Sequence, residues 1–117
     1  MDNLVEFYIA GVQFHESKRV QHFMSVDMKL SMTPEPENKY DSNAIALRFE
    51  IDPNVEATIV EDAMIGYVPA KLSAAMAASL EIYDDLECVL TEVNLDNKPW
   101  EKFKVVIRHI QKEEKDG

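Results

Sequence analysis

Two short stretches combine aromatic rings with polar and basic groups. Phe14 and His15 follow a glycine near the N-terminus, and Lys39, Tyr40 and Asp41 lie between two prolines and a run of alternating apolar residues. Aromatic faces stack on nucleobases, and lysine ammonium groups pair with phosphates. These residue types predict a binding site for single-stranded nucleic acid.

The sequence gives little indication of a metal site or of a catalytic nucleophile. His15, His22 and His109 are not spaced as metal ligands, and the lone Cys88 cannot complete a zinc site. We therefore expect no metal and no cofactor. The apolar neighbours of Cys88 predict a buried structural thiol rather than a nucleophile. The glycines form no phosphate-binding loop, and no catalytic Ser-His-Asp or Cys-His signature occurs.

Carboxylates near the prolines raise the question of acid–base catalysis. Glu35, Glu37 and Asp41 share one stretch, but a catalytic pair needs a cleft and a specific separation. Solvated or turn-forming carboxylates are the commoner outcome for such residues. We do not expect an enzyme.

The charge of the chain opposes tight binding to nucleic acid. Its net charge is −10, whereas binding to a phosphate backbone depends on lysine and arginine. The acids gather in residues 52–62 and 81–87 and after residue 113, so a local basic face can survive. The only basic stripe is formed by Lys102, Lys104 and Arg108, for which a solvated strand face is favoured over a DNA track.

The elements that must position these residues are mostly short strands. Residues 34–45 predict an ordered corner between two strands, and residues 70–80 predict an amphipathic helix that follows Pro69. Residues 15–22 form either a loop or a short helical turn. About six strands are expected, from alternating or continuous apolar residues, at 5–14, 26–32, 44–51, 64–68, 87–95 and 101–110. A further short strand at 58–60 is possible.

This pattern predicts a mainly β fold, a small OB-like, partly open antiparallel barrel with one inserted α-helix. The chain is expected to form one domain over residues 1–117, with a core at about 5–110 and a charged tail at 111–117. The methionines at 24, 28 and 32 are interpreted as core filler. We expect a soluble cytoplasmic protein that is a monomer or a weak homodimer and does not enter a membrane.

Three motifs carry a family resemblance. "IAGVQFH" at 9–15, "EPENKYDSNAIAL" at 35–47 and "IGYVPAKLSAAMA" at 65–77 together resemble the HIRAN domain. That family occurs as a module of fork-remodelling DNA translocases and as small bacterial or phage proteins. The resemblance implies an OB-like fold and capture of the 3′ end of single-stranded DNA, in DNA repair or replication-fork processing.

The resemblance also implies roles for particular residues. Tyr40 would stack on the terminal base, and Asp41 would accept a hydrogen bond from the 3′-hydroxyl. The other wall of the pocket would be formed by Gln13, Phe14 and His15, and the remaining expected contacts are Lys39, Tyr67, Lys71 and Phe103.

The chain departs from the DNA-binding members at two places. It has Gln13-Phe14-His15 where they resemble Arg-Tyr-Tyr, and only Lys71 near their basic pair. A protein-interaction module that keeps the fold but has lost DNA binding is therefore the alternative. For Tyr40 the alternative is a ring that caps the core, and for Asp41 it is a purely turn-forming role.

Overall fold

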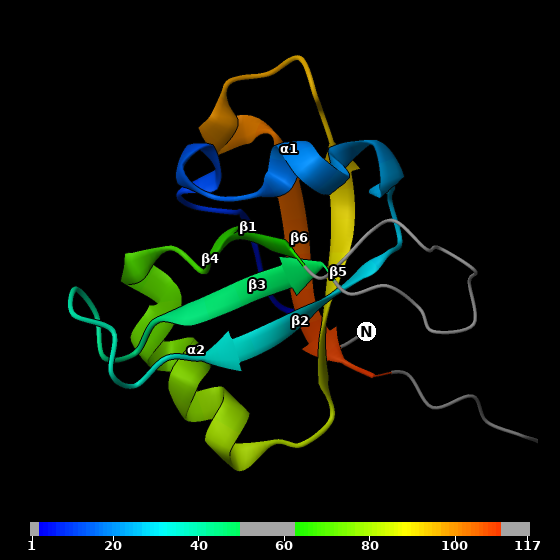
Figure 1. The fold of residues 1–117 in the computed structure, drawn as a ribbon. Coiled ribbons are helices and arrows are strands. Elements are labelled where there is room, and N and C mark those ends of the chain that lie inside the picture. The colour runs from blue at the N-terminus through cyan, green and yellow to red at the C-terminus, as the bar shows by residue number, and fades with distance from the viewer. Residues whose placement is uncertain (1–2, 50–62, 111–117) are drawn as a thin grey trace, which may run out of the picture.

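In the computed structural model, which describes residues 3–49 and 63–110, six antiparallel strands curl into a half-barrel with one main helix (Figure 1). The order of the strands in the sheet is β1-β6-β5-β2-β3-β4. This confirms the predicted mainly β, OB-like fold. The strands are β1 (Asn3–Tyr8), β2 (Lys29–Pro34), β3 (Ile45–Phe49), β4 (Ala63–Tyr67), β5 (Leu86–Val93) and β6 (Phe103–His109), and the main helix is α2 (Ala70–Ile82).

The core fills the inside of the curled sheet. Its fully buried members come from every part of the barrel and include Ile9, Ile45, Leu47, Ile65, Leu90, Phe103 and Ile107. Met24 is buried among them, while Met28 and Met32 pack against this core. The methionines therefore fill the core, as predicted.

The first strand is shorter than the sequence predicted. β1 ends at Tyr8, because Gly11 adopts a left-handed backbone with φ 72° and starts the short 3-10 helix η1 (Val12–Phe14). The expected strand over residues 5–14 is therefore wrong in its second half. Beyond Tyr8 the chain forms an isolated antiparallel bridge between Ala10 and Tyr67, and Ile9 and Val12 are buried in the core.

The open question at residues 15–22 resolves in favour of helical structure. A short helix α1 (Ser17–Val20) runs directly into the 3-10 helix η2 (Gln21–Phe23). Val20 is buried in the core and anchors this segment. Figure 1 shows α1 and η1 at the same end of the barrel as the 3-10 helix η3 (Pro99–Glu101).

The second strand begins later than predicted. Residues 25–28 form a turn in which Asp27 has a φ of 80°, and β2 starts only at Lys29. Val26, expected on the buried face, is 50% exposed. The alternation of polar and apolar residues therefore begins inside the turn, before the strand itself starts.

The remaining elements agree with the sequence. The corner between β2 and β3 is ordered, the helix follows Pro69, and β5 pairs with β6 along its length. Both faces of β3 are buried as far as Leu47. The predicted end of this strand at residues 50–51, the possible strand at 58–60, the acidic stretch at 52–62 and the tail at 111–117 lie outside the described residues.

The basic stripe on β6 is largely neutralised by carboxylates of β5. Glu87, only 8% exposed, pairs with Arg108 at 2.9 Å and with Lys29 of β2 at 2.8 Å. Lys104 lies 3.7 Å from Glu92. The prediction of a solvated strand face over a DNA track is thus supported at these positions, and Lys102 is the member that is not tied to β5 in the described chain.

We expect Glu87→Gln to lower the free energy of unfolding by about 1–2 kcal/mol at neutral pH, because an amide cannot neutralise two cations. Burial alone would raise the pKa of Glu87, but the hydrogen bonds from Lys29 and Arg108 outweigh it and hold that pKa below the ordinary value of 4.5. Such a carboxyl stabilises the fold above its unfolded pKa and loses this effect as pH falls through its folded pKa. The difference between parent and variant should therefore shrink in acid.

Urea denaturation at neutral pH and at about pH 3 measures this difference. Glu81→Gln is the matched control, since it removes the same charge from an exposed helix position and should change stability little. An equal effect of Glu87→Gln at both pH values would contradict the ion-pair explanation.

The single cysteine is structural. Cys88 lies on β5 with no exposed surface, and burial raises the pKa of its thiol to about 12. A thiol that stays protonated is a poor nucleophile.

Within the described residues, no helix is long and apolar enough to span a bilayer.

Candidate functional site

The three sequence motifs meet where the curled sheet closes on itself. After β1 the chain bridges to β4: the Ala10 N–H donates to the Tyr67 carbonyl, and the Tyr67 N–H donates to the Ala10 carbonyl, both at 2.9 Å. The second motif, at 35–47, joins them, because the Val68 N–H donates to the Ile45 carbonyl at 3.1 Å. Segments far apart in the sequence therefore form one surface.

A second pair of hydrogen bonds holds the same edge of β4. The Glu16 N–H donates to the Met64 carbonyl at 2.9 Å, and the Glu16 carboxylate accepts from the Met64 N–H at 3.0 Å. The hydrogen bond from the Met64 N–H holds the pKa of Glu16 below its ordinary value; burial opposes this effect, and the nearby Arg19 adds to it. We call these contacts of Ala10 and Glu16 with β4 the seam.

The backbones at the seam approach so closely that no side chain fits at Gly66. A Cβ atom built there would lie 2.4 Å from the Ala10 carbonyl oxygen and 2.6 Å from Cγ2 of Ile9. Separations under 3.0 Å essentially never occur for real Cβ atoms. The seam therefore requires glycine at this position.

Tyr67 connects the first motif to the corner. Its ring meets the His15 ring edge-on, with 5.4 Å between ring centroids. Its hydroxyl donates to Glu35 Oε1 at 2.8 Å, and the Asn38 side-chain amide donates to the same oxygen at 3.0 Å. Burial, and then the hydrogen bond to Glu35, raise the pKa of Tyr67, so its phenol remains a donor at neutral pH.

The corner is held by its own side chains. Asn38 Oδ1 accepts from the backbone N–H groups of Tyr40 and Asp41, at 2.8 and 3.1 Å. Asp41 accepts from the Asn43 N–H at 2.9 Å and from the Ser73 hydroxyl of α2 at 2.7 Å. The Ser73 bond, followed by the Asn43 bond, holds the pKa of Asp41 below its ordinary value. Asp41 therefore bonds to the backbone of the turn and to α2, and its carboxylate is held in place from two sides.

The carboxylates of this stretch are occupied with structural bonds. Glu35 accepts from Tyr67 and Asn38, and Asp41 accepts from Asn43 and Ser73. The two carboxylates thus hold the corner in place.

Two aromatic rings of the predicted site face solvent. Tyr40 is 96% exposed, so the alternative in which its ring caps the core is wrong. Phe14, on η1, is 77% exposed. Around them Gln13, Lys39 and Lys71 are exposed as well, and the protein surface therefore offers rings and cations to a ligand.

One predicted contact residue does not reach the surface. Phe103 has no exposed area and packs in the core at the start of β6, next to Val105 and Ile107 on the same strand face. Its inclusion among the contact residues is corrected here, because a ring without exposed surface cannot stack on a base.

Sequence reasoning missed several residues near the site. Ser73 was hidden within an alanine-rich helix, although it fixes Asp41. Trp100 on η3 is exposed, with the Lys98 ammonium 5.7 Å from the centre of its ring. An exposed tryptophan between lysines in a turn is a signal that the sequence analysis did not use.

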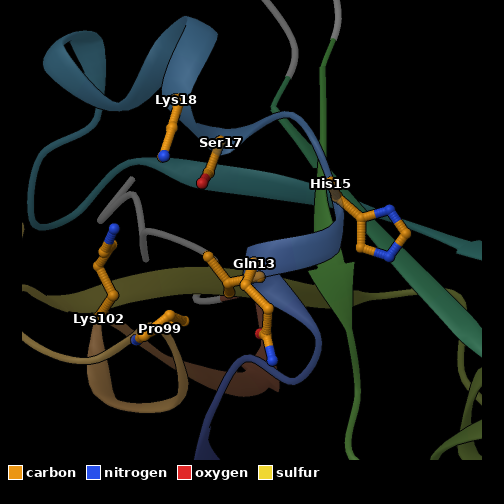
Figure 2. Close-up of a pocket in the computed structure, with 7 residues that line it drawn as sticks. Gln13, His15, Ser17, Lys18, Pro99 and Lys102 are labelled. Carbon is orange, nitrogen blue, oxygen red and sulfur yellow. The ribbon is translucent and has the colours of Figure 1, made fainter.

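A pocket of about 280 Å³ lies where η1, α1 and η3 meet (Figure 2). Gln13 and His15 were predicted site residues, and Lys102 belonged to the basic stripe. Lys18 is new. The pocket is lined by Val12, Gln13, His15, Ser17, Lys18, Pro99 and Lys102.

Comparison with known families identifies the fold. The family model of the HIRAN domain matches residues 2–107. The chain belongs to the HIRAN domain family. The match spans all three motifs, so the resemblance seen in the sequence is confirmed. No curated protein sequence matches this HIRAN domain.

Two solved structures share the architecture of this HIRAN domain. The crystal structure of the HIRAN domain of human HLTF has a TM-score of 0.59 and 14% identity, with coverage of 90% of this chain and 73% of that chain. A protein from Lactobacillus plantarum has a TM-score of 0.64 and 18% identity, with coverage of 92% of this chain and 96% of that chain. At these identities the likeness shows the fold.

The site offers no ready metal centre. Within residues 3–49 and 63–110, no group of three or more His, Cys, Asp or Glu side chains is arranged to hold a metal ion. His109 instead pairs with Asp85 at 3.0 Å, at the far end of β6.

Proposed function

We propose that this HIRAN domain binds the 3′ end of single-stranded DNA without catalysing a reaction, in DNA repair or the processing of replication forks. The observation that carries the proposal is the ring of Tyr40, which is 96% exposed on a corner fixed by Asn38 and Asp41. A solvent-facing ring on an ordered support is a ready stacking surface for a terminal base.

Asp41 supplies the group that would recognise the end. A carboxylate has about four acceptor positions, and Ser73 and Asn43 occupy two of them. The remaining positions can accept a hydrogen bond from a 3′-hydroxyl, and a charged acceptor makes that bond stronger than a neutral one. A 3′-phosphate in the same place would meet the carboxylate with like charge.

The first motif provides the opposite wall. Gln13 and Phe14 are exposed on η1, and His15 is held against Tyr67. Tyr67 therefore acts by positioning His15 and the corner. Lys39 and Lys71 supply the cations nearest to the corner and the helix entry.

Affinity for DNA should be modest and sensitive to salt. Gln13 stands where the DNA-binding members carry arginine, and the net charge of −10 repels a polyanion at long range. Both features lower the number of phosphates that the protein neutralises.

Fluorescence anisotropy at low salt tests the proposal with two short single strands. One strand ends in a 3′-hydroxyl and the other, of the same sequence, ends in a 3′-phosphate. We expect binding of the first and at least about a tenfold weaker binding of the second, because a lost charged hydrogen bond and like-charge contact are each worth on the order of 1 kcal/mol or more. Equal affinity for both strands would reject end capture.

The charge also favours a second candidate, a protein-interaction module. Its support is the −10 net charge together with the glutamine at position 13. A salt titration separates the two candidates, because binding to phosphates weakens steeply with added salt. Absence of binding to either strand, even at high micromolar protein, would leave the interaction module as the function of this fold.

A further inference from the structure

The pocket between η1, α1 and η3 has the composition of an anion site. Two of its lining residues are lysines, Lys18 and Lys102, and none is acidic. Figure 2 shows both ammonium groups extending toward the same space, from α1 above and from the start of β6 below. We propose that this pocket holds an internal phosphate of the single strand whose 3′ end lies at Tyr40. The proposal rests on the function proposed above.

A buried hydroxyl completes the lining. Ser17 is 2% exposed, and Figure 2 shows its oxygen directed toward the space between the two lysines. No hydrogen bond joins this hydroxyl to another residue of the described chain. The hydroxyl can therefore donate to a ligand in the pocket, and a hydrogen bond to a charged phosphate oxygen is stronger than one to a neutral group.

The two lysines differ from the cations that lie beside β5. Lys29, Lys104 and Arg108 each lie within ion-pair distance of a carboxylate on β5. In the part of the chain that the structure describes, neither Lys18 nor Lys102 has a carboxylate partner. Two ammonium groups that share a pocket repel each other, and an anion between them would remove that repulsion.

The pocket shares residues with the proposed end-binding site. His15 lines the pocket and, through its ring, contacts Tyr67 of the seam. Gln13 lines it as well. Lys18 and Lys102 therefore place two cations beside the segment that carries the predicted site residues Gln13 and His15.

The size of the pocket suits a phosphate. Its volume of about 280 Å³ corresponds to several water molecules at about 30 Å³ each. A phosphodiester group with part of its hydration shell fits within that volume. The chemistry selects a phosphate, since the lining offers two ammonium groups and a hydroxyl, all of them donors.

The test compares two double variants with equal loss of charge. Lys18→Gln/Lys102→Gln removes the pocket cations, whereas Lys98→Gln/Lys104→Gln removes two cations near Lys102 in the sequence that do not line the pocket. Binding of the strand with a free 3′-hydroxyl is measured by anisotropy over a range of salt. Thermal unfolding checks that both variants are folded.

We expect the pocket variant to bind about five- to tenfold more weakly at low salt, and the slope of log K against log salt to fall by about 0.7, the value for one phosphate of a single strand. Its preference for a 3′-hydroxyl over a 3′-phosphate should persist, because Tyr40 and Asp41 are unchanged. The control variant should keep most of the parent's affinity. Equal affinities and slopes in the two double variants would overturn the phosphate site while leaving end capture intact.

A second measurement separates failure of the pocket from failure of the proposed function. Inorganic phosphate is titrated into the parent protein, and the amide signals of Ser17 and Lys18 are followed by NMR. If the parent binds no DNA, end capture fails, and saturable shifts of these signals would still support an anion pocket. No shift in that case would overturn the pocket as well.

Discussion

Replacing Gly66 by alanine is expected to destabilise the fold more than the addition of a methyl group at any other position of the seam. The new Cβ would lie 2.4 Å from a backbone oxygen, which cannot rotate away as a side chain can. To relieve this close contact, the chain at Ala10 must move away from β4. The two hydrogen bonds of the Ala10–Tyr67 bridge would then be lost. Overpacking costs about 1–3 kcal/mol, and each lost hydrogen bond adds about 1 kcal/mol.

We therefore expect the free energy of unfolding of Gly66→Ala to fall by about 3 kcal/mol, a large part of the 5–15 kcal/mol typical of a domain. Denaturant unfolding measures the shift in midpoint. Gly11→Ala is the matched control: its φ is also unfavourable for alanine at +72°, but the nearest atoms to an added Cβ lie 3.8 Å away. A left-handed alanine costs about 1–2 kcal/mol, so a Gly66→Ala effect no larger than that of Gly11→Ala would refute the close-contact argument.

Tyr40→Ala should remove most of the affinity for single-stranded DNA while leaving the fold unchanged. The ring contacts little of the protein, with 96% of its surface exposed. Surface substitutions usually change stability by less than about 0.5 kcal/mol, so the Tm should stay within about 2 °C of the parent. Stacking on one base is worth about 1–3 kcal/mol, which corresponds to a loss from roughly fivefold to more than a hundredfold. Anisotropy with the 3′-hydroxyl strand measures this loss.

Two further variants isolate the ring as the cause. Tyr40→Phe keeps the stacking face and should bind nearly as well as the parent. Phe23→Ala removes an exposed ring on η2, outside the predicted site, and should not alter affinity. If Tyr40→Ala binds the strand as tightly as the parent does, the assignment of the site to the corner is wrong.

The fold could be predicted where the signals were local. Pro69 before an alanine-rich run located the start of α2, and alternation located β5 and β6. Prediction failed where backbone geometry departs from the hydrophobic pattern. The left-handed Gly11 ends extended structure inside a continuous apolar run, and Asp27 turns the chain within an alternating one. A hydrophobic pattern indicates which residues are buried. These two residues show that it does not indicate the backbone conformation.

The candidate site was predictable only in part, because its contacts are long-range. The motif residues Tyr40 and Asp41 were found from their types and from the family resemblance, but the Ser73 bond that fixes Asp41 joins residues 32 positions apart. Lys18 and Lys102 share a pocket through the packing of η3 against η1, for which the sequence carries no sign. Phe103 was already on the apolar face of its strand in the sequence, and this pattern should have excluded it as a contact.

Because the seam holds the two walls of the site together, ligand binding and local opening of the barrel at the seam are thermodynamically coupled. If the hydrogen bonds of Ala10 and Glu16 to β4 broke, Tyr67 would separate from the segment that carries Gln13, Phe14 and His15, and the two walls of the site would part. A strand that needs both walls binds only the closed form. At a ligand concentration of a hundred times Kd, such binding stabilises the closed form by about 2.7 kcal/mol. A bound DNA end would thus keep the barrel closed at the seam.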